Sequence, residues 1–149
     1  MRVNYKILPL TKPEPAFPGQ TSYWMPILNI SINNPATHSP QTRRFEAIVD
    51  SGAPDCYLHA DIGRAVGLKI EKGIKGTIGG IVAGPQVDVY YHDVNLWVGA
   101  GPVKIRAGFS DKVSVAAILG RRGFFENFIV TFDPSANPPG FEIQRLGRA

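Results

Sequence analysis

The chain has 149 residues, the length of one domain at about 150 residues per domain. Sixteen Lys and Arg residues against twelve Asp and Glu residues give a net charge of +4, yet charged residues make up only 19% of the chain. This is below the ~25% typical of soluble domains. We therefore expect no nucleic-acid partner, because coating a phosphate backbone requires a much denser set of positive charges.

A single cysteine, Cys56, excludes an intrachain disulfide and a cysteine-based zinc cluster, and it fits a reducing compartment. No apolar run approaches the ~18 residues of a membrane span. The first fifteen residues lack the sustained apolar core and the small-residue cleavage site of a signal peptide. We therefore expect a cytoplasmic protein with no membrane partner.

Glycine and proline are abundant, with 16 and 13 residues, which favours short strands joined by turns over long helices. Seven of the prolines lie within residues 1–40. Because proline lacks the N–H needed for ladder pairing, residues 1–40 are predicted to be an N-terminal extension packed on or flanking the domain, mostly loop with short edge strands. Residues 24–32 are its best strand candidate. The main domain is predicted to span residues 41–149.

After a predicted loop at residues 33–42, the elements follow in short succession. Two helical turns are predicted at residues 59–66, with Gly67 as their left-handed stop, and a short helical turn is predicted at residues 121–126. A glycine-rich hairpin is expected at residues 75–84. The longest strand is expected at residues 86–98, where the apolar alternation changes phase near His92 and Asp93 and predicts a bulge or a bend. Further strands are predicted at residues 45–49, 103–107, 113–119, 128–133 and 140–145. The fold class is mainly β.

A carboxylate directly follows the strand at residues 45–49, in the sequence Ala47-Ile48-Val49-Asp50-Ser51-Gly52-Ala53. This order places an ionisable group where the chain leaves the core, and burial of such a group is costly unless it is hydrogen-bonded or paired. Read alone, Asp-Ser-Gly is also typical of an Asx turn that ends a strand, and three-residue matches arise by chance.

Two further segments add specificity. Ile118-Leu119-Gly120-Arg121 lies about 70 residues after Asp50, and Thr77-Ile78-Gly79-Gly80-Ile81 lies between the two. Taken separately, the first predicts a core strand that ends in a turn and the second a surface hairpin. In this order, the three segments resemble the retropepsin family, the single-domain aspartic proteases of retroviral type.

The resemblance covers roughly residues 44–145 and implies a pepsin/retropepsin-like closed β-barrel-type lobe with a short helix and a β-hairpin flap, active as a symmetric homodimer. It implies an aspartic endopeptidase that cleaves polypeptide substrates and needs no cofactor and no metal.

The same resemblance assigns roles to individual residues. Asp50 is the catalytic carboxylate, and because the chain carries a single Asp-Ser-Gly, each of two subunits must contribute one. Ser51, Gly52 and Ala53 are expected to support the active site. The flap tip, which closes over substrate and excludes water, consists of Ile78, Gly79, Gly80 and Ile81.

Two departures from the family concern structural residues. The resemblance implies structural roles for Gly120 and Arg121. In retroviral enzymes this Arg pairs with an acid, but in this chain that position is Pro54, and the acid lies one residue later, at Asp55. Arg121 either reaches Asp55 through a shifted loop or has another partner. The hairpin at residues 128–145 is expected to form much of the dimer interface, through the apolar residues Phe128, Val130, Phe132, Phe141 and Ile143.

Other functions remain open at this stage. A catalytically silent dimerisation or peptide-binding module would keep the fold, and a self-processing domain would be cut from a longer precursor. Cys56 with His59 as its base is a further candidate nucleophile. The three His residues show no metal-ligand spacing, and the glycine-rich segment lacks the Gly-Lys-Ser/Thr of a phosphate-binding loop.

Overall fold

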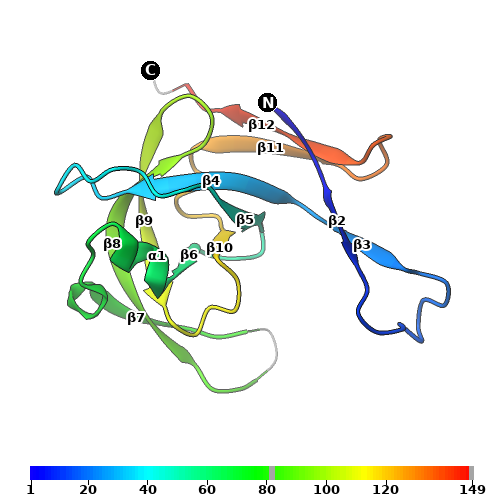
Figure 1. Cartoon of the computed structure of the whole chain (residues 1–149), viewed down its shortest axis with the longest axis horizontal. Coiled ribbons are helices and arrows are strands. Elements are labelled where there is room, and N and C mark those ends of the chain that lie inside the picture. Colours follow the sequence, from blue (N-terminus) through cyan, green and yellow to red (C-terminus); the bar gives the residue numbers. More distant parts are fainter. Residues whose placement is uncertain (81–82, 148–149) are drawn as a thin grey trace.

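A computed structural model describes residues 1–80 and 83–147 (Figure 1). The chain forms short strands and little helix, as its glycine and proline content predicts. The strands are β1 (Arg2–Asn4), β2 (Lys6–Pro9), β3 (Ser22–Met25), β4 (Ile27–Asn33), β5 (Phe45–Val49), β6 (Cys56–His59), β7 (Ile74–Ile78), β8 (Val87–Trp97), β9 (Pro102–Ser110), β10 (Ala117–Leu119), β11 (Phe128–Asp133) and β12 (Gly140–Arg145). The helices are α1 (Ala60–Ala65) and the 3₁₀ turn η1 (Ile70–Lys72).

The body of the molecule is a closed β-barrel. Its strands follow the order β4-β5-β10-β6-β9-β8, and β4 pairs back onto β8 to close the ring. The short β10 lies between β5, to which it is parallel, and β6, to which it is antiparallel. β7 pairs with β8 alone and extends the sheet beyond the barrel. The prediction of a mainly β fold with a closed barrel and a short helix is confirmed.

The core of the barrel is filled by apolar side chains that alternate along its strands, as the pleat requires. Fully buried members include Ile30, Ile32, Leu58, Leu96, Phe109 and Leu119, and Phe124 follows β10 into the same cluster. Because interiors are packed to near-crystalline density, these residues fix the spacing between the strands that carry the polar loops.

The helix begins and ends as its sequence predicts. His59 is the N-cap, and its Nδ1 accepts the backbone N–H of Asp61 at 3.1 Å. The chain leaves the helix through Gly67, whose φ of +82° few other residues adopt. Gly63 faces Ile70 and Phe109 so closely that a side chain would meet both, which lets α1 lie directly on the barrel.

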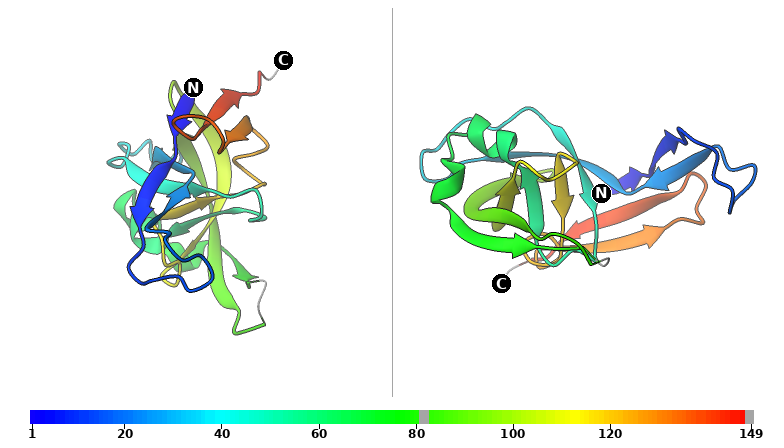
Figure 2. Two further views of the ribbon diagram at one scale, coloured as in Figure 1. Left: turned by 90° about the vertical axis from the view of Figure 1, so that its right-hand side faces the viewer. Right: turned by 90° about the horizontal axis from the view of Figure 1, so that it is seen from below.

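Two smaller sheets lie outside the barrel. β1, β12 and β11 form a three-stranded sheet that brings the first and last segments of the chain together, and the N-terminal amine donates to Ile143 O at 2.8 Å. β2 and β3 form a separate two-stranded hairpin. The right-hand view of Figure 2 shows this hairpin projecting from the body, on the same side as the β11–β12 hairpin.

Residues 1–40 contribute more strand than their prolines suggest, because the prolines stand at the ends of strands or between them. Pro9 ends β2, and Pro26 separates β3 from β4. β4 lies before residue 40 and still pairs with β5 and β8 in the barrel. The domain boundary predicted at residue 40 therefore stays a prediction, and the barrel strand β4 lies before it in the chain.

The bulge predicted near His92 is wrong. β8 pairs with β9 without a break in register from Tyr90 to Trp97. The apolar pattern changes phase because the other neighbour of β8 changes, from β7 along residues 87–91 to β4 along residues 95–97.

In the β11–β12 hairpin, Phe128, Phe141 and Ile143 are buried within their own chain, so the exposed apolar residues available to a second subunit are Ile129 and Phe132.

The turn after β10 gives a test of the fold. A Cβ at Gly120 would lie 2.1 Å from Asp55 O and 2.6 Å from Ala53 O, both backbone atoms that cannot move aside. Gly120→Ala should lower the free energy of unfolding by about 3 kcal/mol or more, as overpacking against backbone does. Gly84→Ala is the control, because nothing lies within 4 Å of its Cβ, and its effect should stay within about 0.5 kcal/mol in urea unfolding. Equal effects would show that the close approach at Gly120 is not a constraint.

Candidate active site

Asp50 occupies the first position after β5, where the chain leaves the barrel. Val49 is buried at 3% exposure while Asp50 is exposed, so the boundary between core and solvent falls between these two residues. The Asp50 N–H donates to Leu119 O at 3.0 Å, which continues the parallel pairing of β5 with β10. The carboxylate is therefore held at the rim of the barrel by the backbone of two adjacent strands.

The loop turns sharply at the carboxylate itself. Gly52 N–H donates to Asp50 Oδ1 at 2.9 Å, and Ala53 N–H donates to Asp50 O at 3.2 Å. A Cβ at residue 52 would lie 3.1 Å from Asp50 Oδ1, so a larger residue would crowd the oxygen. Within residues 1–80 and 83–147, no Lys, Arg or His nitrogen lies within ion-pair distance of this carboxylate.

The loop at residues 50–55 is tied to the turn at residues 119–122 along its whole length. Arg121 N–H donates to Ala53 O and Arg122 N–H to Pro54 O, each at 2.9 Å. The Arg121 side chain reaches back over the loop, and its Nη1 donates to Ser51 O at 3.2 Å and to Gly52 O at 3.1 Å. The partner of Arg121 is therefore the loop backbone, and not Asp55.

Asp55 pairs instead with Arg122, the next residue along. The Asp55 side chain is only 7% exposed, and both of its oxygens accept hydrogen bonds from the Arg122 guanidinium. Tyr91 Oη donates to Asp55 Oδ2 at 2.9 Å and Tyr57 Oη at 3.3 Å. Asp55 and Arg122 are also joined by a parallel backbone bridge, which keeps the acid and the arginine in register.

The neighbours of Asp55 decide its ionisation. Burial by itself would raise the pKa of this carboxyl, but the hydrogen bonds from Arg122 and Tyr91, with the positive charge of Arg122, outweigh burial and hold the pKa below its ordinary value. Burial and the negative charge of Asp55 raise the pKa of Tyr91, so its hydroxyl stays a donor. The cluster is an ionised pair that joins the Asp50 loop to β8.

The predicted flap is a two-stranded hairpin outside the barrel. β7 and β8 pair from Ile74 with Tyr91 to Ile78 with Val87, so the connecting loop spans residues 79–86. Gly79 and Gly80 begin this loop and are exposed. Gly79 does not have a positive φ, and a Cβ there would make only ordinary contact, at 3.8 Å, with Gln86. Ile81 lies outside the described residues.

Cys56 lies in the core and not at an open site. It is fully buried, its Sγ lies 3.5 Å from Arg122 O, and burial raises the pKa of the thiol to about 11. At neutral pH this thiol is protonated, which does not suit a nucleophile. The His59 side chain, its expected base, caps α1 instead.

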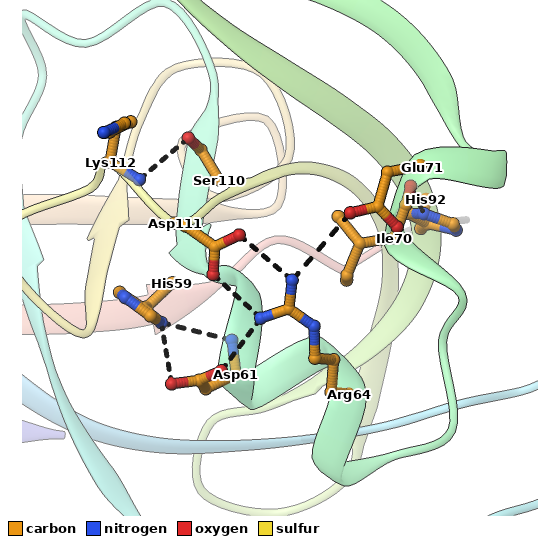
Figure 3. A network of polar contacts seen from close by, with 9 residues as sticks. All are labelled: His59, Asp61, Arg64, Ile70, Glu71, His92, Ser110, Asp111 and Lys112. Carbon is orange, nitrogen blue, oxygen red and sulfur yellow. Dashed lines mark hydrogen bonds and ion pairs between the residues drawn. The ribbon is translucent and has the colours of Figure 1, made fainter.

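A second polar cluster lies at the opposite end of β6, around α1 (Figure 3). One nitrogen of His59 and one oxygen each of Asp61 and Asp111 lie within 4.8 Å of one another. Arg64 reaches between the acids, donating to Asp111 at 2.8 and 3.0 Å and to Asp61 at 2.9 Å. The guanidinium thus supplies the positive charge that these carboxylates balance, and it ties α1 to the segment after β9.

Comparisons with known proteins give a limited result. Neither the models of known protein families nor the sequences of curated proteins gave a match. Among solved structures, the chain is similar to an EIAV protease complexed with the inhibitor HBY-793, with 22% identity, 65% of this chain and 82% of that chain covered, and a TM-score of 0.45. A similarity of this size says nothing of activity or of individual residues. No helix among the described residues has both the length and the apolar character needed to cross a bilayer.

The ion pair between the nearly buried Asp55 and the exposed Arg122 predicts a pH dependence of stability. Since the folded pKa of Asp55 is lowered, its ionised form contributes stability that is complete above the unfolded pKa of about 3.9 and is lost as pH falls through the folded pKa. The difference in unfolding free energy between wild type and Asp55→Asn should be largest above about pH 5 and should shrink below about pH 4. Urea unfolding between pH 3 and 7 measures it.

The two neighbouring arginines provide a matched pair for the same experiment. Arg122→Gln leaves a buried carboxylate without its cation, so acidification should relieve part of the loss. Arg121→Gln removes the neighbouring cation, which does not contact Asp55, and should keep the wild-type pH profile. Identical profiles for both variants would contradict the assignment of Arg122 as the partner.

Proposed function

We propose that the protein is an aspartic endopeptidase of the retropepsin type, in which two chains each contribute Asp50 to one active site. The observation that supports this most is the state of Asp50. Its carboxylate is exposed at the rim of the barrel, has no cationic partner in the described residues, and stands on a loop whose backbone is fixed by residues 119–122. A purely structural aspartate at a strand end would need none of this bracing.

The chemistry needs a second carboxylate beside the first. Two carboxylates about 3 Å apart share one proton, so that one acts as base while the other acts as acid. The base takes a proton from a water molecule, whose oxygen then forms a bond to the carbon of the scissile carbonyl, while the acid donates its proton to the carbonyl oxygen. Collapse of this tetrahedral intermediate breaks the C–N bond: the carboxyl that took the water's proton gives it to the leaving nitrogen, and one hydroxyl of the intermediate returns its proton to the other carboxylate as the C=O bond re-forms.

A homodimer supplies that second carboxylate. The chain has one Asp-Ser-Gly, and in the part of the chain described the hydrogen-bond donor to the Asp50 carboxylate is the Gly52 N–H. A two-fold axis beside Asp50 would bring the same exposed group from the partner opposite it. The substrate is an extended polypeptide, which fits between two exposed hairpins by adding a strand to them.

Replacement of Asp50 tests the proposal. Asp50→Asn keeps the size of the side chain and an oxygen for the Gly52 N–H, but it removes the shared proton, so cleavage of a peptide library should fall at least about 10³-fold with unchanged thermal stability. Asp133→Asn is the matched control, because Asp133 is an exposed aspartate that caps the β11–β12 turn. Cleavage that survives in Asp50→Asn would overturn the proposal. Peptide binding without cleavage by wild type would favour a silent binding module.

The hairpin tip tests the role of the flap. Gly79→Val puts a branched side chain on a segment that must close over substrate, and we expect kcat/KM to fall at least about tenfold. The space at Gly79 is open, so the free energy of unfolding should change by less than about 1 kcal/mol. Gly84→Val is the control, because Gly84 lies further along the same loop and nothing lies within 4 Å of its Cβ. It tests whether the effect depends on the position of the substitution within the loop. Loss of stability in step with activity would identify a structural hairpin.

A further inference from the structure

In the part of the chain that the structure describes, the β2–β3 hairpin joins no other sheet. We call residues 6–25 the arm; it comprises β2, β3 and the loop between them. Within the described residues, β2 and β3 pair only with each other, and the arm projects away from the barrel (Figures 1 and 2). A two-stranded hairpin by itself is only marginally stable in water. Both of its outer edges offer unpaired backbone groups.

The arm also exposes large apolar side chains. Ile7 and Trp24 lie directly opposite each other on the two strands and are 62% and 48% exposed. Phe17, in the loop, is 64% exposed, and Tyr23 is 41% exposed. With about 150–250 Å² for each aromatic side chain, the exposed apolar area is on the order of 300 Å². Ile7 and Trp24 thus form an exposed apolar pair on one face near the base of the arm, Phe17 extends the apolar surface in the loop, and Tyr23 points to the opposite face.

The base of the arm lies beside Asp50. Val49 N–H donates to Pro26 O at 2.9 Å, so the residue before Asp50 is bonded to the residue that follows β3. β4 runs antiparallel to β5, with Ile27 opposite Ile48, and the arm therefore continues outward past the end of β5 at which Asp50 stands. Lys6 and Glu46 form an ion pair that holds the base of β2 against β5.

We propose that the arm is a subunit clasp, which packs through Ile7, Trp24 and Phe17 against a second copy of this chain. The inference rests on the proposed function in one respect: a partner whose Asp50 meets this Asp50 must approach the end of β5, which is the side past which the arm extends. The two exposed edges of the arm then pair with, or pack on, the surface of that partner.

Area and charge favour a second copy as the occupant. A stable interface buries about 800 Å² on each partner, and two arms related by a two-fold axis each bring on the order of 300 Å² of apolar area to it. The arm has only three charged residues, Lys6, Lys12 and Glu14, and Lys6 is already paired within its own chain. Depletion of charge with enrichment of aromatic residues is the composition of an interface core.

Sedimentation velocity over a concentration series tests the clasp independently of activity. The double variant Ile7→Ser and Trp24→Ser removes two exposed anchors and should raise the dimer dissociation constant at least about tenfold. Ile74→Ser is the matched control, because Ile74 is 60% exposed but stands on β7. An unchanged dissociation constant in the double variant, or a wild-type chain that stays monomeric, would overturn the clasp.

Fluorescence of Trp24 gives a second readout that does not depend on losing an anchor. The chain has two tryptophans, and in Trp97→Phe the remaining one reports on the arm. Its emission should shift to the blue as protein concentration rises through the dimer transition. A shift produced by an uncleavable peptide at concentrations where the chain is monomeric would overturn the clasp and assign the arm to substrate.

The two proposals fail separately. An arm variant that is monomeric and inactive when dilute, but recovers cleavage when concentrated, supports both. A wild-type dimer that depends on the arm and cleaves no peptide supports the clasp and refutes the protease. An active dimer that is indifferent to the arm substitutions refutes the clasp and leaves the protease standing.

Discussion

The structure depends on one backbone contact, the close approach of the turn at Gly120 to the loop at residues 50–55. Because Gly120 has no side chain, Asp55 O and Ala53 O can lie against its Cα. The N–H groups of Arg121 and Arg122 then bond to the loop, and the Asp50 N–H bonds to Leu119 O. The carboxylate is thus positioned by backbone atoms of buried strands and not by side chains in solvent.

The polar contacts of Asp55 connect this loop to β8. Asp55 is nearly buried, and a lone carboxylate there would be costly. Arg122 neutralises it, and the hydroxyls of Tyr57 and Tyr91 both donate to its Oδ2. Tyr91 stands on β8, which also forms one side of the predicted flap, so the loop and the base of the flap share one rigid cluster.

Two hairpins that lie outside the barrel project on the same side of the molecule and have a similar apolar surface. The arm and the β11–β12 hairpin both leave the body in the same direction (Figure 2), and both expose large apolar residues, among them Trp24 on the arm and Ile129 and Phe132 on β11. The barrel itself buries its apolar side chains within the chain. Most of the exposed large apolar side chains in the described residues therefore stand on these two hairpins, which suits elements that complete their packing on another molecule.

The sequence by itself determined the local features of this protein. Apolar runs gave β5, β11 and β12 with their bounds, and Gly67 predicted the end of α1, because these signals depend on neighbours within a few residues. Tertiary structure decided the rest. β4 joins the barrel, β8 changes partners without a bulge, and Arg122 takes Asp55 while Arg121 holds the loop, because each outcome depends on which distant strand lies alongside. A one-residue choice between two adjacent arginines leaves no trace in composition or periodicity, and only the register of residues 119–122 against residues 50–55 settles it.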